Sequence, residues 1–73
     1  MMALTYRQYD ALESAVARGL RIAVQRRGTE YIVIPLSLGV RLGREVIEAR
    51  NPTTGDSMSL FIDEVESLET LSR

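Results

Sequence analysis

The segment from Leu20 to Leu38, LRIAVQRRGTEYIVIPLSL, restricts the fold more than any other part of the chain. Its first apolar residues recur at every second position, and this period predicts a strand with one buried face. Arg27-Gly28-Thr29 follows as a tight reversal, because glycine supplies the positive φ that a short hairpin needs. Tyr31 to Ile34 are aromatic or aliphatic on both faces and predict the most buried strand. Pro35 cannot donate to a ladder, so we expect regular pairing to end or bulge there.

A helix with explicit end signals precedes this hairpin. Thr5 and Gln8 form a capping box, in which each side chain binds the backbone N–H of the other residue. Apolar residues then recur at helical spacing. Arg18 and Gly19 supply the basic last turn and the left-handed residue that end many helices. These signals predict a helix over residues 6–18.

Turn residues divide the rest of the chain into three further strands. Gly39 and Gly43 bracket an expected second turn, and residues 51–56 combine asparagine, proline and glycine in a third. Residues 63–66 have the composition of a short capped turn. Together with the hairpin, these turns predict strands over residues 20–27, 30–36, 44–50, 57–62 and 67–71.

One helix followed by five short strands predicts an α+β fold that is mostly β. A chain of 73 residues is one small domain with a thin core, so we treat residues 1–73 as a single unit. A five-stranded antiparallel sheet curled into a small barrel would bury one face and leave few free edges. We expect the helix to cover one open end or the side of that barrel.

The absence of two residue types excludes several classes of function. The sequence contains neither cysteine nor histidine, which excludes thiolate chemistry and removes the commonest metal ligand and the best acid–base side chain near neutral pH. It also has no glycine-rich phosphate loop and no nucleophile motif. We therefore expect a protein that is not an enzyme and that carries no cofactor and no metal.

Hydropathy along the chain bears on its location. No apolar run approaches the ~20 residues that a bilayer span needs, and the N-terminus lacks the basic and apolar regions of a signal peptide. We therefore expect a cytoplasmic protein that does not act on a membrane.

Charge is distributed unevenly along the chain, although the net charge is only −1. Eight arginines and five acids precede Asp56, giving +3, whereas one arginine and five acids from Asp56 onward give −4. All nine basic residues are arginine, which is typical either of a GC-rich genome or of selection for bidentate contacts with anions or carboxylates. The overall balance predicts no general attraction to nucleic acid.

The order and spacing of these features resemble a WYL domain, the Sm-like small barrel of bacterial transcription regulators and defence-associated proteins. The resemblance runs from about Ala11 to Leu71 and begins with the helix end ALESAVARGL. The later positions that match are Pro35, Leu38, Gly43, Ala49, Gly55, Leu60, Ile62, Asp63 and Val65. The resemblance implies an Sm-like barrel and a link to regulation.

The chain departs from the family pattern at functional positions. The triplet that names the family falls on Glu45-Val46-Ile47, which keeps only the third, aliphatic position. Family members place arginines on the last strand and just after the aspartate, where this chain has Phe61 and Glu64. The resemblance therefore implies the fold more fully than the anion- or nucleotide-sensing surface attributed to the family.

Arginines near two turns form the first candidate site. Two turns of a small barrel can face the same way, which would gather these side chains into a basic rim for phosphate. In the simpler interpretation they are solvated turn residues, some of them paired with Glu30 and Glu45. The candidate contacts for nucleic acid or a small anion are Arg21, Arg26, Arg27, Arg41 and Arg44.

Two apolar residues form the second candidate site, a protein interface. If Leu60 and Ile62 face the core, the period of two points Phe61 outward. Either the helix then covers Phe61, or this side chain belongs to an exposed patch that binds another chain. Val46 lies on the strand face opposite Ile47 and extends this surface.

The tyrosines and the C-terminal acids have two interpretations each. Tyr6, Tyr9 and Tyr31 could stack on bases, but Tyr9 and Tyr31 also suit core positions with their hydroxyls at the surface. The acids could form a metal or acid–base cluster, but without histidine a solvated acidic face fits better. These acids are Asp63, Glu64, Glu66 and Glu69.

Two functions therefore stand side by side. The first is a non-catalytic interaction module that forms a homo-oligomer or docks on a larger protein. The second is a regulatory sensor that binds nucleic acid, a nucleotide or another small anion through the turn arginines. Binding of the second kind should weaken steeply as salt is added.

Overall fold

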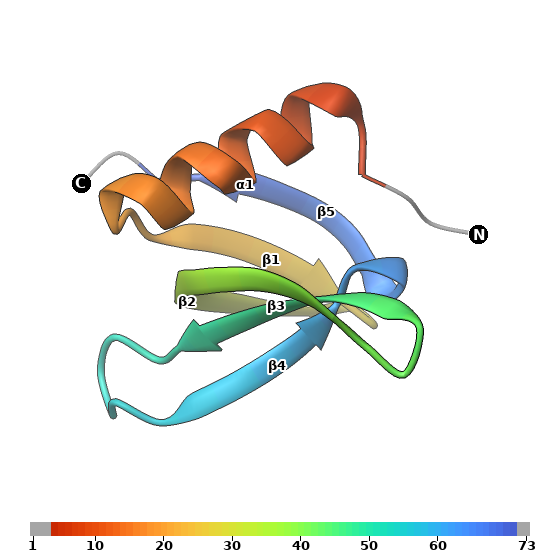
Figure 1. The fold of residues 1–73 in the computed structure, drawn as a ribbon. Coiled ribbons are helices and arrows are strands. Elements are labelled where there is room, and N and C mark those ends of the chain that lie inside the picture. Colours follow the sequence, from red (N-terminus) through yellow and green to blue (C-terminus); the bar gives the residue numbers. More distant parts are fainter. Residues whose placement is uncertain (1–3, 72–73) are drawn as a thin grey trace.

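The structure, a computed structural model, describes residues 4–71. One helix is followed by four strands, a short 3-10 helix and a fifth strand (Figure 1). The elements are α1 (Tyr6–Arg18), β1 (Ile22–Arg26), β2 (Thr29–Arg41), β3 (Arg44–Arg50), β4 (Ser57–Phe61), the 3-10 helix η1 (Ile62–Glu64) and β5 (Val65–Thr70). Within the described part of the chain, no helix is both long enough and apolar enough to cross a bilayer.

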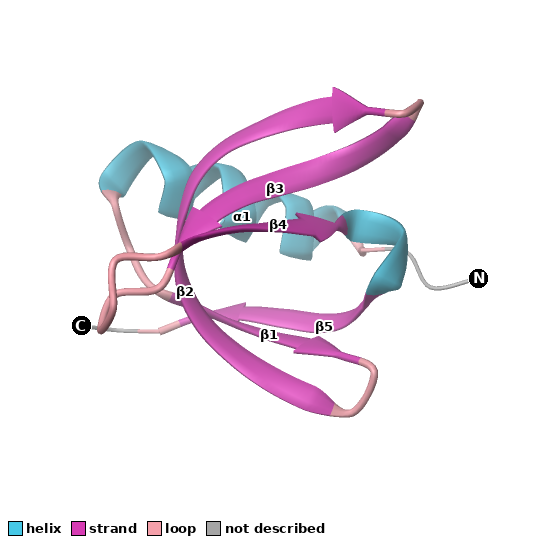
Figure 2. Cartoon of the chain, turned by 90° about the horizontal axis from the view of Figure 1, so that it is seen from below, coloured by secondary structure: helices cyan, strands magenta, loops and turns pink. Residues whose placement is uncertain are grey.

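The five strands form one antiparallel sheet in the order β4-β3-β2-β1-β5. The central strand β2 is long and bent, so Thr29–Val33 pair with β1 while Ile34–Arg41 pair with β3. The sheet curls around one face as a result, and Figure 2 shows the β2–β3 hairpin projecting from the curl. The expected fold class, a helix followed by a five-stranded antiparallel barrel-like sheet, is confirmed.

The hydrophobic core fills the space between α1 and the concave face of the sheet. The largest fully buried side chains are Leu12, Ile22, Ile47, Leu60, Val24, Val33, Val65 and Pro35. The most buried strand is β1, whereas Ile32 in the segment expected to be most buried is partly exposed. That expectation was wrong because β1 has a strand on each side, β2 and β5, and so lies at the centre of its half of the sheet.

The helix begins and ends where the sequence predicts. The Thr5 hydroxyl accepts a hydrogen bond from the Gln8 backbone N–H at 3.1 Å, and the Gln8 side chain accepts from the Thr5 N–H at 2.9 Å. These two bonds satisfy donors that a helix start leaves free. At the other end Gly19 adopts a left-handed conformation with φ of 69°. The helix 6–18 is therefore confirmed to the residue.

Both hairpins turn on two residues with positive φ. Arg27 and Gly28 connect β1 to β2 with φ of 53° and 77°, and Leu42 and Gly43 connect β2 to β3 with φ of 57° and 73°. Positive φ at both central residues is the mark of a type I′ turn, whose twist matches that of the flanking strands. The second reversal is therefore tighter than expected, and Gly39 lies within β2 instead of bracketing it.

The largest error in the expected boundaries concerns β2. We expected this strand over 30–36, ending near Pro35, but it continues to Arg41. Pro35 is accommodated because the register with β3 shifts between Pro35 and Ser37, so a bulge absorbs the missing donor. The alternative that Pro35 causes a bulge is thus the correct one.

The other differences are small and lie at strand ends. The strand expected over 20–27 covers Ile22–Arg26, and the strand expected over 57–62 ends at Phe61. The strand expected over 67–71 is β5, which begins earlier, at Val65, and ends at Thr70. Residues 63–66 do not form a capped turn: η1 has no side-chain cap, and Val65 already belongs to β5.

Candidate functional site

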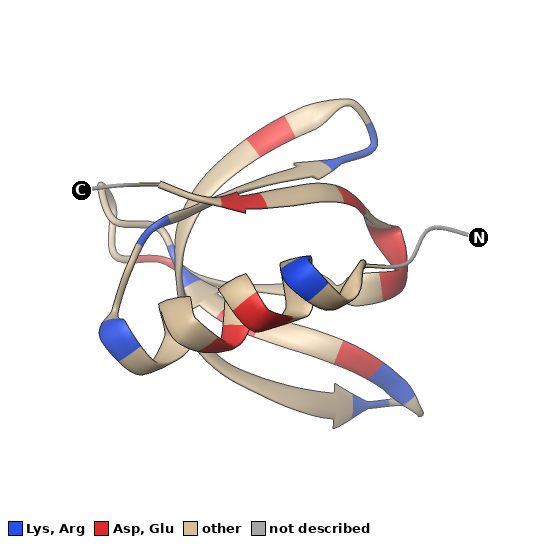
Figure 3. Ribbon diagram, turned by 90° about the horizontal axis from the view of Figure 1, so that it is seen from above, with Lys and Arg blue, Asp and Glu red and all other residues tan. Residues whose placement is uncertain are grey.

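The two hairpin turns and η1 lie at the same end of the molecule, as Figures 1 and 2 show. Basic and acidic segments therefore meet at this end (Figure 3). We call this group the charged cluster; its members are Arg26, Arg27, Arg44, Asp63 and Glu64. The two turns do lie at the same end of the molecule, as expected. Three of the five candidate arginines belong to the charged cluster there.

Arg44, the first residue of β3, makes the closest contacts in the charged cluster. Its Nε donates to Asp63 Oδ2 at 2.8 Å and its Nη2 donates to Asp63 Oδ1 at 2.6 Å. Nη2 also lies 3.2 Å from Glu64 Oε2. The guanidinium carbon stands 3.9 Å from the centre of the Phe61 ring, within cation–π range. The side chain of Arg44 is thereby fixed by two carboxylates and one aromatic face.

These contacts shift the acidity of both partners. The hydrogen bonds from Arg44 hold the pKa of the Asp63 carboxyl below its usual value of 3.8. The same bonds, with a smaller contribution from Glu64, raise the pKa of the Arg44 guanidinium. Both groups are therefore charged throughout the ordinary pH range, and the pair persists across it.

Glu64 is shared among three arginines of the charged cluster. Besides its bond to Arg44, its carboxylate lies 3.9 Å from Arg26 Nη1 and 3.6 Å from Arg27 Nη2. Arg26 also donates to the Tyr31 hydroxyl at 3.1 Å and lies 4.9 Å from the centre of that ring. The partners expected for these arginines, Glu30 and Glu45, are therefore wrong: the acids of η1 take their place.

The remaining two candidate arginines lie apart from the charged cluster. Arg41 binds Glu48 at 2.5 Å and Ser59 at 3.2 Å, and the Ser59 hydroxyl donates to Glu48 at 2.7 Å. Arg21 is exposed just before β1 and forms no salt bridge within residues 4–71. The structure thus divides the proposed basic rim into a cluster, a separate ion pair and an isolated residue.

The chemistry of the charged cluster is that of a mostly neutralised site. Three guanidinium groups face two carboxylates, so the five members of the cluster together carry one excess positive charge. The Arg26 Nε is buried without a hydrogen-bond partner, and each of the three guanidinium groups forms an ion pair with Glu64. Among the described residues no group of acidic, histidine or cysteine side chains is placed to hold a metal ion. An external anion would therefore have to compete with Glu64 and Asp63 for the same donors.

The proposed interface residues Val46 and Phe61 are not an exposed pair. Val46 is only 2% exposed, so its expected place on an open surface was wrong. It lies on the outer face between its cross-strand neighbours Gly39 and Phe61. On the same face, Arg41 pairs with the start of β3 and its side chain reaches along the strand to Glu48. Phe61 is half-buried beneath Arg44 instead of beneath α1.

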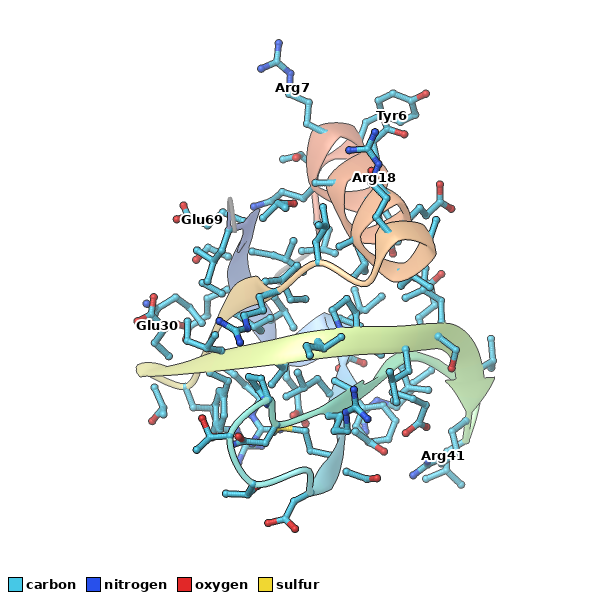
Figure 4. The ribbon with its side chains drawn as sticks, turned by 90° about the vertical axis from the view of Figure 1, so that its left-hand side faces the viewer. Tyr6, Arg7, Arg18, Glu30, Arg41 and Glu69 are labelled. Atoms are coloured by element: carbon cyan, nitrogen blue, oxygen red, sulfur yellow. The ribbon has the colours of Figure 1, made fainter. Side chains whose placement is uncertain are left out.

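The two tyrosines expected at the core edge are there. Tyr9 and Tyr31 are partly buried and pack against the core, and each hydroxyl has a polar partner. The Tyr9 hydroxyl donates to Glu45, which ties α1 to the start of β3 and raises the pKa of Tyr9. Tyr6 projects outward from the first turn of α1 and is almost fully exposed (Figure 4). None of the three forms a stacking platform with another tyrosine.

The sequence interpretation missed a surface on the outer half of β2. Leu38 pairs with Ile47 and Val40 with Glu45, so both side chains continue the face that is buried elsewhere in the sheet. Toward the hairpin tip, fewer core residues cover this face. The exposed fraction of the side chains therefore rises from 36% at Leu38 to 73% at Val40 and 84% at Leu42. We call the exposed side chains of this strand end the apolar row: Leu36, Leu38, Val40 and Leu42.

A sequence signal for the apolar row did exist. In LSLGVRL every second residue is aliphatic, which is the pattern of a strand with one apolar face. It was overlooked because Pro35 suggested that the strand ends, and because Gly39 and Gly43 suggested a wide turn. A strand that bulges at a proline keeps its period on the far side of the bulge.

Comparisons with known proteins bear on the fold. No family model matches this chain, and no curated protein matches it. Among solved structures it is similar to proteasome accessory factor B/C (PafBC) of Arthrobacter aurescens, with a TM-score of 0.77 and 23% sequence identity. The similarity covers 100% of this chain and 13% of PafBC. PafBC contains a WYL domain, and at this identity the likeness shows the fold alone. The fold is WYL-like.

Proposed function

We propose that this chain is a non-catalytic protein-interaction module and that the apolar row on β2 is its binding surface. The observation that carries the proposal is the exposure of four aliphatic side chains on one strand end, at a hairpin that projects from the sheet (Figure 2). Contiguous apolar surface of this kind commonly marks a site where another protein binds. The proposal moves the interface from Val46 and Phe61 to the other side of the same hairpin.

Leu42 gives the strongest support because it stabilises neither the turn nor the core. It occupies a left-handed position with φ of 57°, where asparagine or glycine is preferred and a branched apolar residue is disfavoured. Its side chain is 84% exposed. A leucine at such a place is explained if its side chain contacts something outside the chain.

The comparison with PafBC offers a setting for this proposal. That protein is named as an accessory factor, and the present chain aligns with 13% of its length. A domain that forms a small share of a larger protein needs surfaces for contact with other domains or chains. At 23% identity this likeness supports the fold, and the proposed role in association rests on the apolar row.

Binding of a small anion is the second candidate function, and one observation favours it. The buried Nε of Arg26 lacks a hydrogen-bond partner within the charged cluster, and the cluster keeps an excess of one positive charge. Glu64 and Asp63 weaken this candidate because they occupy the outer donors. Binding of short RNA, short DNA or phosphate that falls steeply with salt would support it, whereas absence of binding at low salt would remove it.

A capture experiment tests the interaction module with a variant designed to keep the fold. Val40→Thr retains a β-branched strand residue, and Leu42→Asn places a preferred residue in the left-handed position. The immobilised wild-type chain and this double variant are compared for proteins retained from cell extract, including added copies of the chain itself. Ile32→Thr serves as the control because Ile32 is a partly exposed aliphatic residue on the inner half of the same strand.

The proposal predicts that the wild type and the Ile32→Thr control retain the same specific protein and that the double variant loses it. Circular dichroism and thermal unfolding confirm that all three chains are folded. Identical retention by the wild type and a folded double variant would show that the apolar row is not the binding surface.

A further inference from the structure

The outer half of β2 has a free backbone edge. From Ile34 onward β2 pairs with β3 on one side only, because β1 pairs with the strand no further than Val33. Among residues 4–71 the only hydrogen bonds that this segment makes outside the ladder come from the Arg41 side chain. The backbone groups that point away from β3 are therefore available to another strand.

Few of the usual protections against strand addition are present here. Edges are commonly blocked by charged side chains, proline or bulges. Pro35 and the bulge that follows it protect only the start of this segment. Beyond them Arg41 is the only charged residue before the turn, and its side chain is bound to Glu48 on the outer face. The edge from Leu38 to Leu42 is open and mostly apolar.

The other free strand edges are less suited to binding. The inner half of β2, Thr29–Val33, also pairs on one side only, with β1, but Ile32 is its one exposed aliphatic residue. In β4 the side chains are buried or half-buried apart from Ser57, so no exposed apolar row accompanies its edge. In β5 the exposed positions include Glu66 and Glu69, whose charges oppose pairing with a second acidic strand. Among residues 4–71, the outer half of β2 is the segment that combines a free backbone edge with several exposed aliphatic side chains.

This combination identifies the chemistry of the partner as an extended strand with apolar residues at alternate positions. The segment itself has this pattern. If two copies pair antiparallel about a twofold axis at Gly39, Leu36 faces Leu42 and Leu38 faces Val40, so every member of the apolar row faces another member across the interface. In this register Arg41 faces Ser37 of the second copy, so the two arginines do not oppose each other.

We propose that two copies of this chain associate through the outer halves of their β2 strands, forming a sheet that is continuous across the dimer. The inference rests on the proposed function and names its partner as a second copy of the chain. Pairing satisfies the free backbone groups and brings two apolar rows onto one face, where they shield each other from water. The exposed Leu42 of each copy then lies within the interface instead of in solvent.

Sedimentation equilibrium of the purified full-length chain tests this proposal. The wild type should show a concentration-dependent monomer–dimer equilibrium. The Val40→Thr/Leu42→Asn variant should remain monomeric at concentrations at least tenfold higher, and the Ile32→Thr control should dimerise like the wild type. Because the chain has no cysteine, a Val40→Cys variant also offers a single thiol. A short bismaleimide should cross-link this variant into a dimer, and an Ile32→Cys variant should give no cross-linked dimer.

Two results would overturn the proposal. One is a wild-type chain that stays monomeric at all concentrations, and the other is a dimer that persists unchanged in the folded double variant. The purified sample contains only this chain, so a monomeric wild type that still captures another protein through the apolar row would reject self-pairing alone. Failure of the capture experiment for every protein, including added copies, would instead reject the interaction module.

Discussion

At the scale of single residues, Asp63 should control part of the pH dependence of stability. Its pKa in the folded chain lies below the usual 3.8 because Arg44 donates two hydrogen bonds to it. A lowered pKa stabilises the folded state above the unfolded pKa, and this contribution disappears as the pH falls through the folded value. The Asp63→Asn variant should therefore lose less stability than the wild type between about pH 5 and about pH 3.

Urea unfolding at a series of pH values measures this difference. The free energies of unfolding of the wild type and of Asp63→Asn should converge as the pH falls. Parallel curves for the two chains across the same range would mean that the Arg44–Asp63 pair contributes nothing to acid stability.

Val46 and Val40 provide a second comparison at this scale, since they are the same residue type on adjacent strands. Val46 is 2% exposed and Val40 is 73% exposed. Val46→Ala should lower the free energy of unfolding by roughly 1.5–2.5 kcal/mol, because about two buried methylene equivalents are lost. Val40→Ala should change it by about 0.5 kcal/mol or less. Unfolding is measured at low concentration, where association does not contribute, and equal effects of the two changes would contradict the assigned exposure.

At the scale of elements, the β2–β3 turn should show a conflict between stability and binding. Leu42 is left-handed, and this conformation costs most L-residues about 1–2 kcal/mol. Asparagine tolerates it better, so Leu42→Asn should stabilise the dilute monomer by up to about 1 kcal/mol. Thermal unfolding checks this prediction, and a clear loss of stability would show that Leu42 serves the fold of its own chain.

The elements were predictable to different degrees, for physical reasons that differ from one element to another. The helix over Tyr6–Arg18 has local signals at both ends, so its bounds followed from neighbouring residues alone. The first hairpin was found because Gly28 lies between two β-rich segments. The far half of β2 was missed because a bulge at Pro35 needs β3 as a partner, and that pairing is not visible in local sequence.

The candidate site was also only partly predictable, because its contacts join residues that are far apart in the sequence. The arginines near the turns were recognisable, and the structure does bring three of them together. Their partners lie 20 or more residues further along the chain in most cases, in η1, and no periodicity links Arg26 or Arg44 to Glu64. Val46 was misplaced because the alternation of residues gives the strand face on which a side chain lies, whereas its burial depends on how the neighbouring strands and side chains pack in three dimensions.

At the scale of the whole molecule, folding brings together part of the opposite charge that the sequence separates. The first part of the chain carries +3 and the last part −4, and the acids of η1 meet the arginines of both hairpin turns at one end of the molecule (Figure 3). The apolar row lies on the β2–β3 hairpin, which also carries Arg44 of that cluster. The surface most available to a partner is therefore apolar.

Residue-resolved amide exchange, followed by NMR at several concentrations, tests the central claim most directly. If the outer half of β2 is a binding edge used by a second copy, the amides between Leu38 and Leu42 that point away from β3 should become more protected as concentration rises. Amides at the equally free edge of β4 should keep constant protection. Exchange in the β2 segment that is fast and independent of concentration would contradict the claim.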